Sequence, residues 1–201
     1  LGALLNLNYK YDDKYMVQTV PRTDAHSSFG KNHRWGLFKG VSVGWRFSEE
    51  PWIRNLNFIG ESMLRASWGV SGRQPTDVYA RFATYGGSSP GNYITYPGIV
   101  NTQIQLDNLQ WETITSTDLG FELNLFNDRI YIEGDWYTKK TTNLLFKDYD
   151  IPSSSGFKQL KYLNGGALGN KGWEIMFDYK LVRKKDFRMS VNFNVTHNVN
   201  S

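Results

Sequence analysis

The chain has 201 residues, of which 23 are Lys or Arg and 19 are Asp or Glu, and it contains no cysteine. The missing cysteines exclude disulfide scaffolds, thiolate metal sites and cysteine nucleophiles. The charges are spread without a long run of one sign, so nothing favours a nucleic-acid partner, and no segment approaches the ~20 consecutive apolar residues of a membrane-spanning helix.

In the first half of the chain, apolar residues alternate with polar or small ones. This is the period-two pattern of a strand with one apolar face. Only residues 14–22 indicate no clear face. The apolar positions, in chain order, are Ala3, Leu5, Leu7 and Tyr9, then Trp35, Leu37, Val41, Val43, Trp45 and Phe47, then Leu64, Ala66, Trp68 and Val70.

The second half repeats the alternation more cleanly. Its apolar positions are Leu119, Phe121, Leu123 and Leu125, then Ile130, Ile132, Gly134 and Trp136, then Trp173, Ile175, Phe177, Tyr179 and Leu181, then Phe187, Met189, Val191, Phe193 and Val195. The whole pattern predicts an all-β, antiparallel fold of about eight strands. Several approach the ~9–11 residues of a membrane-crossing strand instead of the ~5–6 usual in soluble sheets.

The connections between these strands alternate between short and long. The short series is 11–14, the moderate linker 48–57, 126–129 and 182–186, with Asn and Asp supplying turn chemistry. The long series is 23–34, 73–110 and 148–165, rich in Gly, Ser, Pro and Asn. Because antiparallel strands place every second connection at the same end, this predicts an outer-membrane β-barrel with short periplasmic turns and long external loops.

Aromatic residues also gather near the predicted strand ends, as expected for girdles at the two membrane interfaces. Tyr9, Tyr11, Tyr15, Phe47, Trp52, Tyr179 and Phe187 lie toward the short turns, and Trp35, Trp68, Trp111, Trp136 and Trp173 lie toward the long loops. The alternative is a soluble β-sandwich whose core is capped by Trp and Tyr, serving as a carbohydrate-binding or adhesion module.

A series of motifs covers nearly the whole chain: Tyr11–Tyr15, Arg22–Asp24, Phe29–Gly30, Arg34–Gly36, Val41–Pro51, Leu64–Gly72, Leu109–Thr113, Leu125–Arg129 and Asn170–Glu174. In order and spacing they resemble the SusC/RagA-like family of TonB-dependent outer-membrane transporters of Bacteroidetes. The chain departs from the family at Ala25–Ser27, where Gly-Ser-Ser is usual, and at Phe38–Lys39, where Phe-Pro is usual.

The resemblance implies that residues 1–201 are part of the barrel of a longer transporter, without its plug domain and remaining strands. It implies a multi-pass location in the outer membrane of a Gram-negative bacterium, in contact with its lipid. The expected function is import of oligosaccharides or oligopeptides. The expected partners are a SusD-like surface lipoprotein and the inner-membrane TonB complex, which would act through the absent plug region.

Two sets of residues are candidate functional positions. Aromatic side chains in the long loop 73–110 suit stacking on sugar rings or gripping a peptide, although packing on the loop itself or on a partner is the alternative. They are Tyr79, Phe82, Tyr85, Tyr93 and Tyr96. The resemblance also implies a lumen-facing charged row that keeps the interior wet and contacts the plug: Arg46, Glu112, Glu122, Glu133, Asp178 and Arg188.

The sequence predicts no catalytic or metal site, and no cofactor. His26, His33 and His197 lack the spacing of metal ligands. The adjacent carboxylates at 12–13 and 49–50 could be imagined as acid–base pairs, but neighbouring side chains in a strand or turn point apart.

Overall fold

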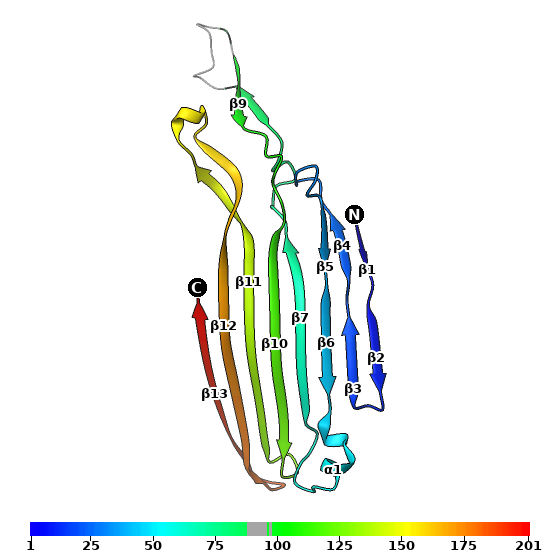
Figure 1. The fold of residues 1–201 in the computed structure, drawn as a ribbon. Coiled ribbons are helices and arrows are strands. Elements are labelled where there is room, and N and C mark those ends of the chain that lie inside the picture. Colours follow the sequence, from blue (N-terminus) through cyan, green and yellow to red (C-terminus); the bar gives the residue numbers. More distant parts are fainter. Residues whose placement is uncertain (88–95, 97) are drawn as a thin grey trace.

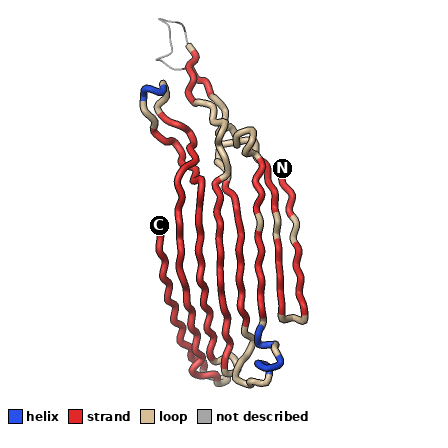
Figure 2. The backbone as a smooth tube through the Cα atoms, in the orientation of Figure 1, coloured by secondary structure: helices blue, strands red, loops and turns tan. Residues whose placement is uncertain are grey.

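The computed structural model describes residues 1–87, 96 and 98–201. The chain forms one tall antiparallel sheet whose strands lie side by side, with hairpins extending beyond one end (Figures 1 and 2). Eight strands are hydrogen-bonded in the order β13-β12-β11-β10-β7-β6-β3-β2. The predicted fold class and strand number are confirmed. Within the described residues the sheet is not closed, and β2 and β13 are its edges.

The first three long strands are each interrupted once. They consist of β1 (Gly2–Leu4) with β2 (Leu7–Tyr11), β3 (Tyr15–Thr19) with β4 (Arg22–Ala25), and β5 (Trp35–Phe38) with β6 (Gly40–Trp45). The register continues across the interruptions, since Thr19 lies opposite Val41 and Arg22 lies opposite Phe38. The small sheet β1-β4-β5 is therefore the upper part of the same wall.

The remaining five strands are longer. They are β7 (Met63–Arg73), β10 (Glu112–Leu125), β11 (Ile130–Asp150), β12 (Gln159–Arg183) and β13 (Arg188–Asn200). The prediction of a loop over 148–165 was wrong in extent, because β11 and β12 stay paired up to Asp150 and Gln159. Asn143 and Gly166 both have positive φ, and the strand pairing continues with the same register on either side of them. They mark a local distortion within a long hairpin and do not end it.

The predicted tight turns at 11–14, 126–129 and 182–186 are confirmed, whereas the linker predicted over 48–57 extends from residue 46 to residue 62. Asp12 and Asp13, at φ 51° and 53°, are the central residues of the turn 11–14 between β2 and β3, in which Lys14 donates its N–H to the Tyr11 carbonyl at 3.0 Å. Two successive positive φ values are those of the mirror-image turn type that matches strand twist. Residues 126–129 join β10 to β11, and the first three of them have positive φ. The linker after β6 contains two short helices, η1 (Phe47–Glu49) and α1 (Pro51–Arg54), with Pro in the first turn of α1 where no N–H is needed.

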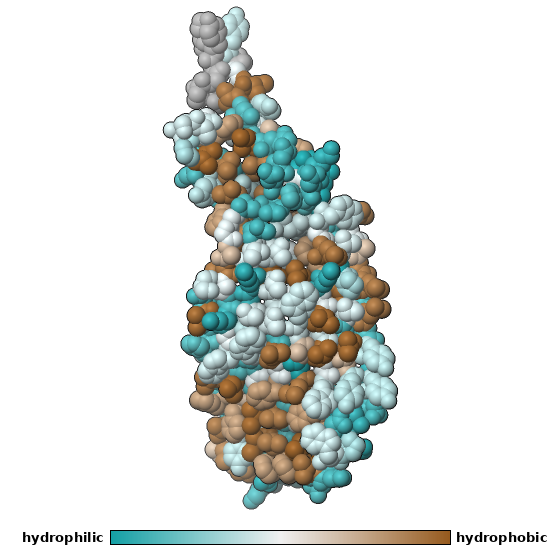
Figure 3. Space-filling view, viewed as in Figure 1, coloured by the Kyte–Doolittle hydropathy of each residue, from teal (hydrophilic) through white to brown (hydrophobic). Residues whose placement is uncertain are grey.

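The two faces of the sheet differ as the alternation predicts. We call apolar the face that carries Leu64, Leu119, Ile132, Ile175 and Phe193, and polar the face that carries Arg65, Glu122, Glu133, Asp178 and Asn194. Large hydrophobic side chains remain exposed on the apolar face. Figure 3 shows hydrophobic side chains gathered toward the short-turn end, and a group of hydrophilic side chains beside hydrophobic ones over the loops at the other end.

The described chain has no second layer packed on this sheet. A soluble sandwich would bury these side chains against a second sheet, so the structure does not support that alternative. The described chain has no helix long and apolar enough to cross a bilayer.

The buried core lies among the long loops instead. Phe29, Ala80, Leu109 and Tyr162 pack together there. The segment 73–110, predicted as loop throughout, contains a hairpin of β8 (Thr84–Gly87) and β9 (Ile99–Gln103). The loop after β11 is reduced to residues around η3 (Ser153–Ser155).

The opposite faces of β13 give a direct test in the full-length protein. Phe193→Arg puts a charge in the centre of the apolar face, where Arg costs ~2–4 kcal/mol in lipid. Asn194→Arg puts the same charge on the polar face, opposite Met176. We expect the yield of folded barrel in the membrane, measured by heat-modifiable gel mobility, to fall only for Phe193→Arg. Equal yields would contradict the assignment of faces.

Candidate functional site

The polar face carries a cluster of four charged side chains from three neighbouring strands. Arg65 on β7 donates to Glu122 on β10 at 2.5 Å, to Glu133 on β11 at 2.6 Å, and to both oxygens of Asp135 at 2.8 and 2.9 Å. Tyr131 donates to the other oxygen of Glu133 at 3.0 Å. We call Arg65, Glu122, Glu133 and Asp135 the Arg65 cluster.

Strand register brings these residues together. Glu122 lies directly opposite Glu133, and Gly120 lies between Arg65 and Asp135, as the partner of each. A Cβ on Gly120 would come within 2.4 Å of both Arg65 Nε and Asp135 Oδ1. Glycine at this position therefore lets the guanidinium lie across β10 and reach β11. Since Glu122 opposite Glu133 would repel, the arginine is what makes this pair of like charges tolerable.

The Arg65 cluster keeps a surplus of negative charge. One guanidinium meets three carboxylates, and the Arg65 side chain is 37% exposed. Arg65 and Asp135 were not among the predicted site residues, although both lie on the polar side of the alternation. The register of the strands cannot be inferred from the sequence. Only the pairing of β7, β10 and β11 shows that residues about 57 to 70 positions apart meet.

The other predicted charged residues lie elsewhere on the sheet. Asp178 is opposite Tyr131, and one of its carboxylate oxygens is buried without a hydrogen-bond partner among the described residues. Arg46 pairs with Glu61 at 3.0 Å beside η1. Glu112 is buried under the loops, where it accepts the N–H of Leu145 at 2.9 Å.

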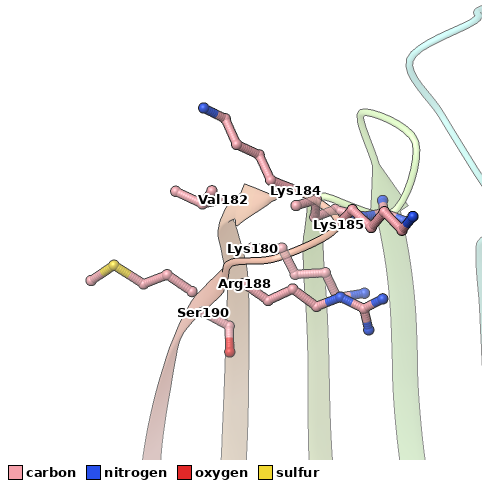
Figure 4. A pocket seen from close by; sticks show the side chains of 8 residues that line it. Lys180, Val182, Lys184, Lys185, Arg188 and Ser190 are labelled. Atoms are coloured by element: carbon pink, nitrogen blue, oxygen red, sulfur yellow. The ribbon is translucent and has the colours of Figure 1, made fainter.

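Arg188 lies in a basic hollow of about 540 Å³ at the short-turn end of β12 and β13. Lys180, Lys185 and Arg188 are directed to the same side of this hairpin, while Val182 points away (Figure 4). Arg183 lies directly opposite Arg188. No described carboxylate forms an ion pair with any of these cations. The hollow is lined by Lys180, Val182, Arg183, Lys184, Lys185, Arg188, Met189 and Ser190.

The loop aromatics lie at the opposite end of the sheet. Tyr79, Tyr85 and Tyr96 are 65%, 69% and 73% exposed, and Phe82 is 38% exposed. The Tyr79 and Phe82 rings lie 6.3 Å apart, and the Arg81 guanidinium lies 4.1 Å from the centre of the Phe82 ring. Tyr93 lies outside the described residues. Among the four described rings, Phe82 is the most covered.

The loop core fixes the segment that carries these rings. Gly30 donates its N–H to Leu109 at 2.8 Å, and Arg81 donates to the Ser27 carbonyl at 3.1 Å, so the loop after β4 is joined to the loop after β7. Asn164 on β12 exchanges two hydrogen bonds with the backbone of Gln110. The loops after β4 and β7 thus form one packed unit with β12.

Asp77 anchors the base of this unit to β12 through an ion pair with Lys161. The next residue toward the N-terminus, Thr76, hydrogen-bonds to the buried Tyr162 hydroxyl at 3.0 Å. The Lys161 ammonium, together with the N–H that Tyr79 donates, lowers the pKa of Asp77 below its ordinary 3.8. The described residues contain no group of three His, Asp or Glu side chains able to hold a metal ion.

Comparison with known proteins gives matches along the whole chain. The family model described as "TonB dependent receptor-like, beta-barrel" matches residues 1–201. TonB-dependent receptor P26 of Formosa agariphila is 35% identical over 96% of this chain and 20% of its own length. TonB-dependent receptor SusC of Bacteroides thetaiotaomicron is 31% identical, again over 96% and 20%. The chain therefore spans about a fifth of the length of these relatives.

Two solved structures have the same fold over nearly all of the chain. The RagAB peptide importer in its closed-closed state matches with a TM-score of 0.87 and 24% identity, over 99% of this chain and 22% of the other. The siderophore receptor PirA from Pseudomonas aeruginosa matches with a TM-score of 0.65 and 17% identity, over 100% and 34%.

The Arg65 cluster predicts an asymmetric response to mutation. Arg65→Gln leaves three carboxylates facing one another, and we expect it to lower barrel stability by about 1–3 kcal/mol. Adding Glu133→Gln removes one of the repelling charges and should restore part of the loss. The measurement is the urea midpoint of the full-length protein in lipid vesicles. A double variant less stable than Arg65→Gln alone would contradict repulsion as the cause.

The Asp77–Lys161 pair predicts a pH-dependent attachment of the loop. Because the folded-state pKa of Asp77 is lowered, its contribution is fully present above about pH 4 and is lost as the pH falls through that lowered value. Protease cleavage between residues 73 and 110 should therefore accelerate below about pH 4, and Asp77→Asn should cleave quickly at neutral pH as well. Cleavage of Asp77→Asn at the wild-type rate would contradict this.

Proposed function

The chain belongs to the family of TonB-dependent receptor-like β-barrels, and from this premise we propose that it serves an outer-membrane importer of oligosaccharides or oligopeptides. Its sheet forms part of a barrel wall in the outer membrane. One observation carries the proposal: an eight-stranded wall with an apolar face, a charged face, tight turns and one helical linker at one end, and packed loops at the other. That arrangement suits passage through a wet interior.

The polar face would line the lumen and hold the plug through which TonB acts. Acidic and basic side chains lie in separate patches of this face, an arrangement that suits contact with a folded plug domain. The Arg65 cluster has a surplus of carboxylates, and the basic hollow around Arg188 has a surplus of cations. A plug with basic groups facing the first and acidic groups facing the second would complete both. Arg46 and Asp178 would extend the same lining, whereas Glu112 is buried under the loops and does not reach the lumen.

The loop end would capture substrate together with a SusD-like lipoprotein. Exposed Tyr rings beside amide and hydroxyl groups can stack on sugar rings and hydrogen-bond at their edges, and they can equally grip a peptide backbone. The packed loop unit supplies a firm base for such rings. A RagAB peptide importer is among the similar proteins, which supports the peptide class, and its likeness together with that to a SusC receptor supports a partner lipoprotein.

Uptake by living cells tests the proposal. We expect deletion of the full-length gene to abolish growth on one class of oligosaccharide or oligopeptide as sole nutrient, and the intact gene to restore it only when TonB is present. Full growth of the deletion strain on every oligosaccharide and oligopeptide offered would contradict an import role, as would TonB-independent uptake.

The loop rings have their own test. Tyr79→Ala and Tyr85→Ala should each weaken binding of the imported substrate to the purified receptor by roughly two- to tenfold. Tyr149→Ala, at an exposed aromatic outside the proposed set, is the matched control. Isothermal titration calorimetry measures all three. Unchanged affinity in both loop variants would assign these rings to partner contact or to loop packing.

A further inference from the structure

The apolar face ends, toward the long loops, in two lysines. On β11 and β12 the apolar face presents Trp136 opposite Trp173. The next pair on this face is Thr138 with Lys171, and the next is Lys140 with Gly169. Both lysines are exposed. Because Lys140 and Lys171 are diagonal neighbours across the two strands, their long side chains can reach the same small group.

The height of these lysines matches a membrane interface. Lys171 and Lys140 lie eight and ten residues beyond the pair Ile130–Tyr179, where β11 begins. At ~3.3 Å per residue and a tilt of ~40°, this is about 20–25 Å, the height of the apolar band of an outer-membrane barrel. The Trp136–Trp173 pair just below suits the aromatic girdle.

No acidic group on this face neutralises the lysines. The carboxylates nearest in sequence, Asp135 and Glu174, are paired with each other in register and lie on the polar face. Within the part of the chain that the structure describes, neither lysine forms an ion pair. On β10 and β11 the neighbouring side chains of this face are instead hydroxyls, while Val199 lies opposite Lys171 on β13. The hydroxyls are Thr113, Thr115, Thr117, Thr138 and Thr142. An unneutralised pair of ammonium groups among hydroxyl donors is suited to an oxyanion.

We propose that Lys140 and Lys171, with Thr138 between them, bind the phosphate of a phosphorylated glycolipid in the outer leaflet. The proposal rests on the location of the sheet in an outer membrane. Two ammonium groups match the charge of a phosphate monoester, and threonine hydroxyls can donate to phosphate or sugar oxygens. The lipid's acyl chains would lie along the apolar face below, against Trp136 and Trp173.

Lys139 provides a matched control. It is the neighbour of Lys140 in sequence and equally exposed, but it lies on the polar face opposite Asn170. The test compares purified full-length receptor carrying Lys140→Gln/Lys171→Gln with receptor carrying Lys139→Gln. Affinity for diphosphorylated lipid A in detergent is measured by microscale thermophoresis, beside the same lipid with its phosphates removed and beside phosphatidylglycerol.

We expect the double variant to bind diphosphorylated lipid A roughly thirty-fold more weakly than the wild type, and Lys139→Gln to bind unchanged. Removing the phosphates should weaken wild-type binding to a similar extent. Wild-type affinity in the double variant, an equal loss in Lys139→Gln, or phosphatidylglycerol binding as tight as the glycolipid would each overturn the proposal. Nutrient uptake by the same variants reports separately on the import role, because neither lysine lies on the polar face.

Discussion

The rest of this structure depends on one constraint: inside a lipid bilayer there is no water to hydrogen-bond to the backbone. A strand that crosses lipid must satisfy every N–H and C=O from its neighbours, so the wall has to be an unbroken antiparallel ladder. The ladder continues across each local interruption, including those at residues 5–6, 20–21 and 39. Once the ladder is fixed, side chains alternate by necessity, and the two faces can meet two different solvents.

On the polar face, the alternation allows charged side chains to gather. Charged side chains on adjacent strands are held close together by the ladder, and Arg65 joins three carboxylates from two other strands because Gly120 leaves space for it. On the apolar face, by contrast, Lys140 and Lys171 lie where the hydrophobic band ends. At the long-loop end, a true hydrophobic core of Phe29, Ala80, Leu109 and Tyr162 orders connections that would otherwise lack support.

Much of the fold was predictable from the sequence because the period of two is a local property. Alternation from Ile130 to Trp136 or from Met189 to Val195 indicates a strand whatever its partner, and Asp12–Asp13 indicates a tight turn. The extent of β11 and β12 was not predictable, since the glycines at 165 and 166 are typical of loops and only pairing shows that the ladder continues. The Arg65 cluster was missed for a related reason: residues 57 to 70 positions apart meet only through register.

The central claim is that one face of this sheet meets lipid and the other meets water. Spin labels on single cysteines placed in turn at residues 191 to 195 of β13 test it most directly, in the full-length receptor reconstituted in lipid bilayers. Residues 1–201 contain no cysteine that would take up the spin label. Labels at Val191, Phe193 and Val195 should collide with lipid-soluble oxygen, and labels at Asn192 and Asn194 with a water-soluble nickel complex. Equal accessibility at all five positions, or a reversed alternation, would contradict the account.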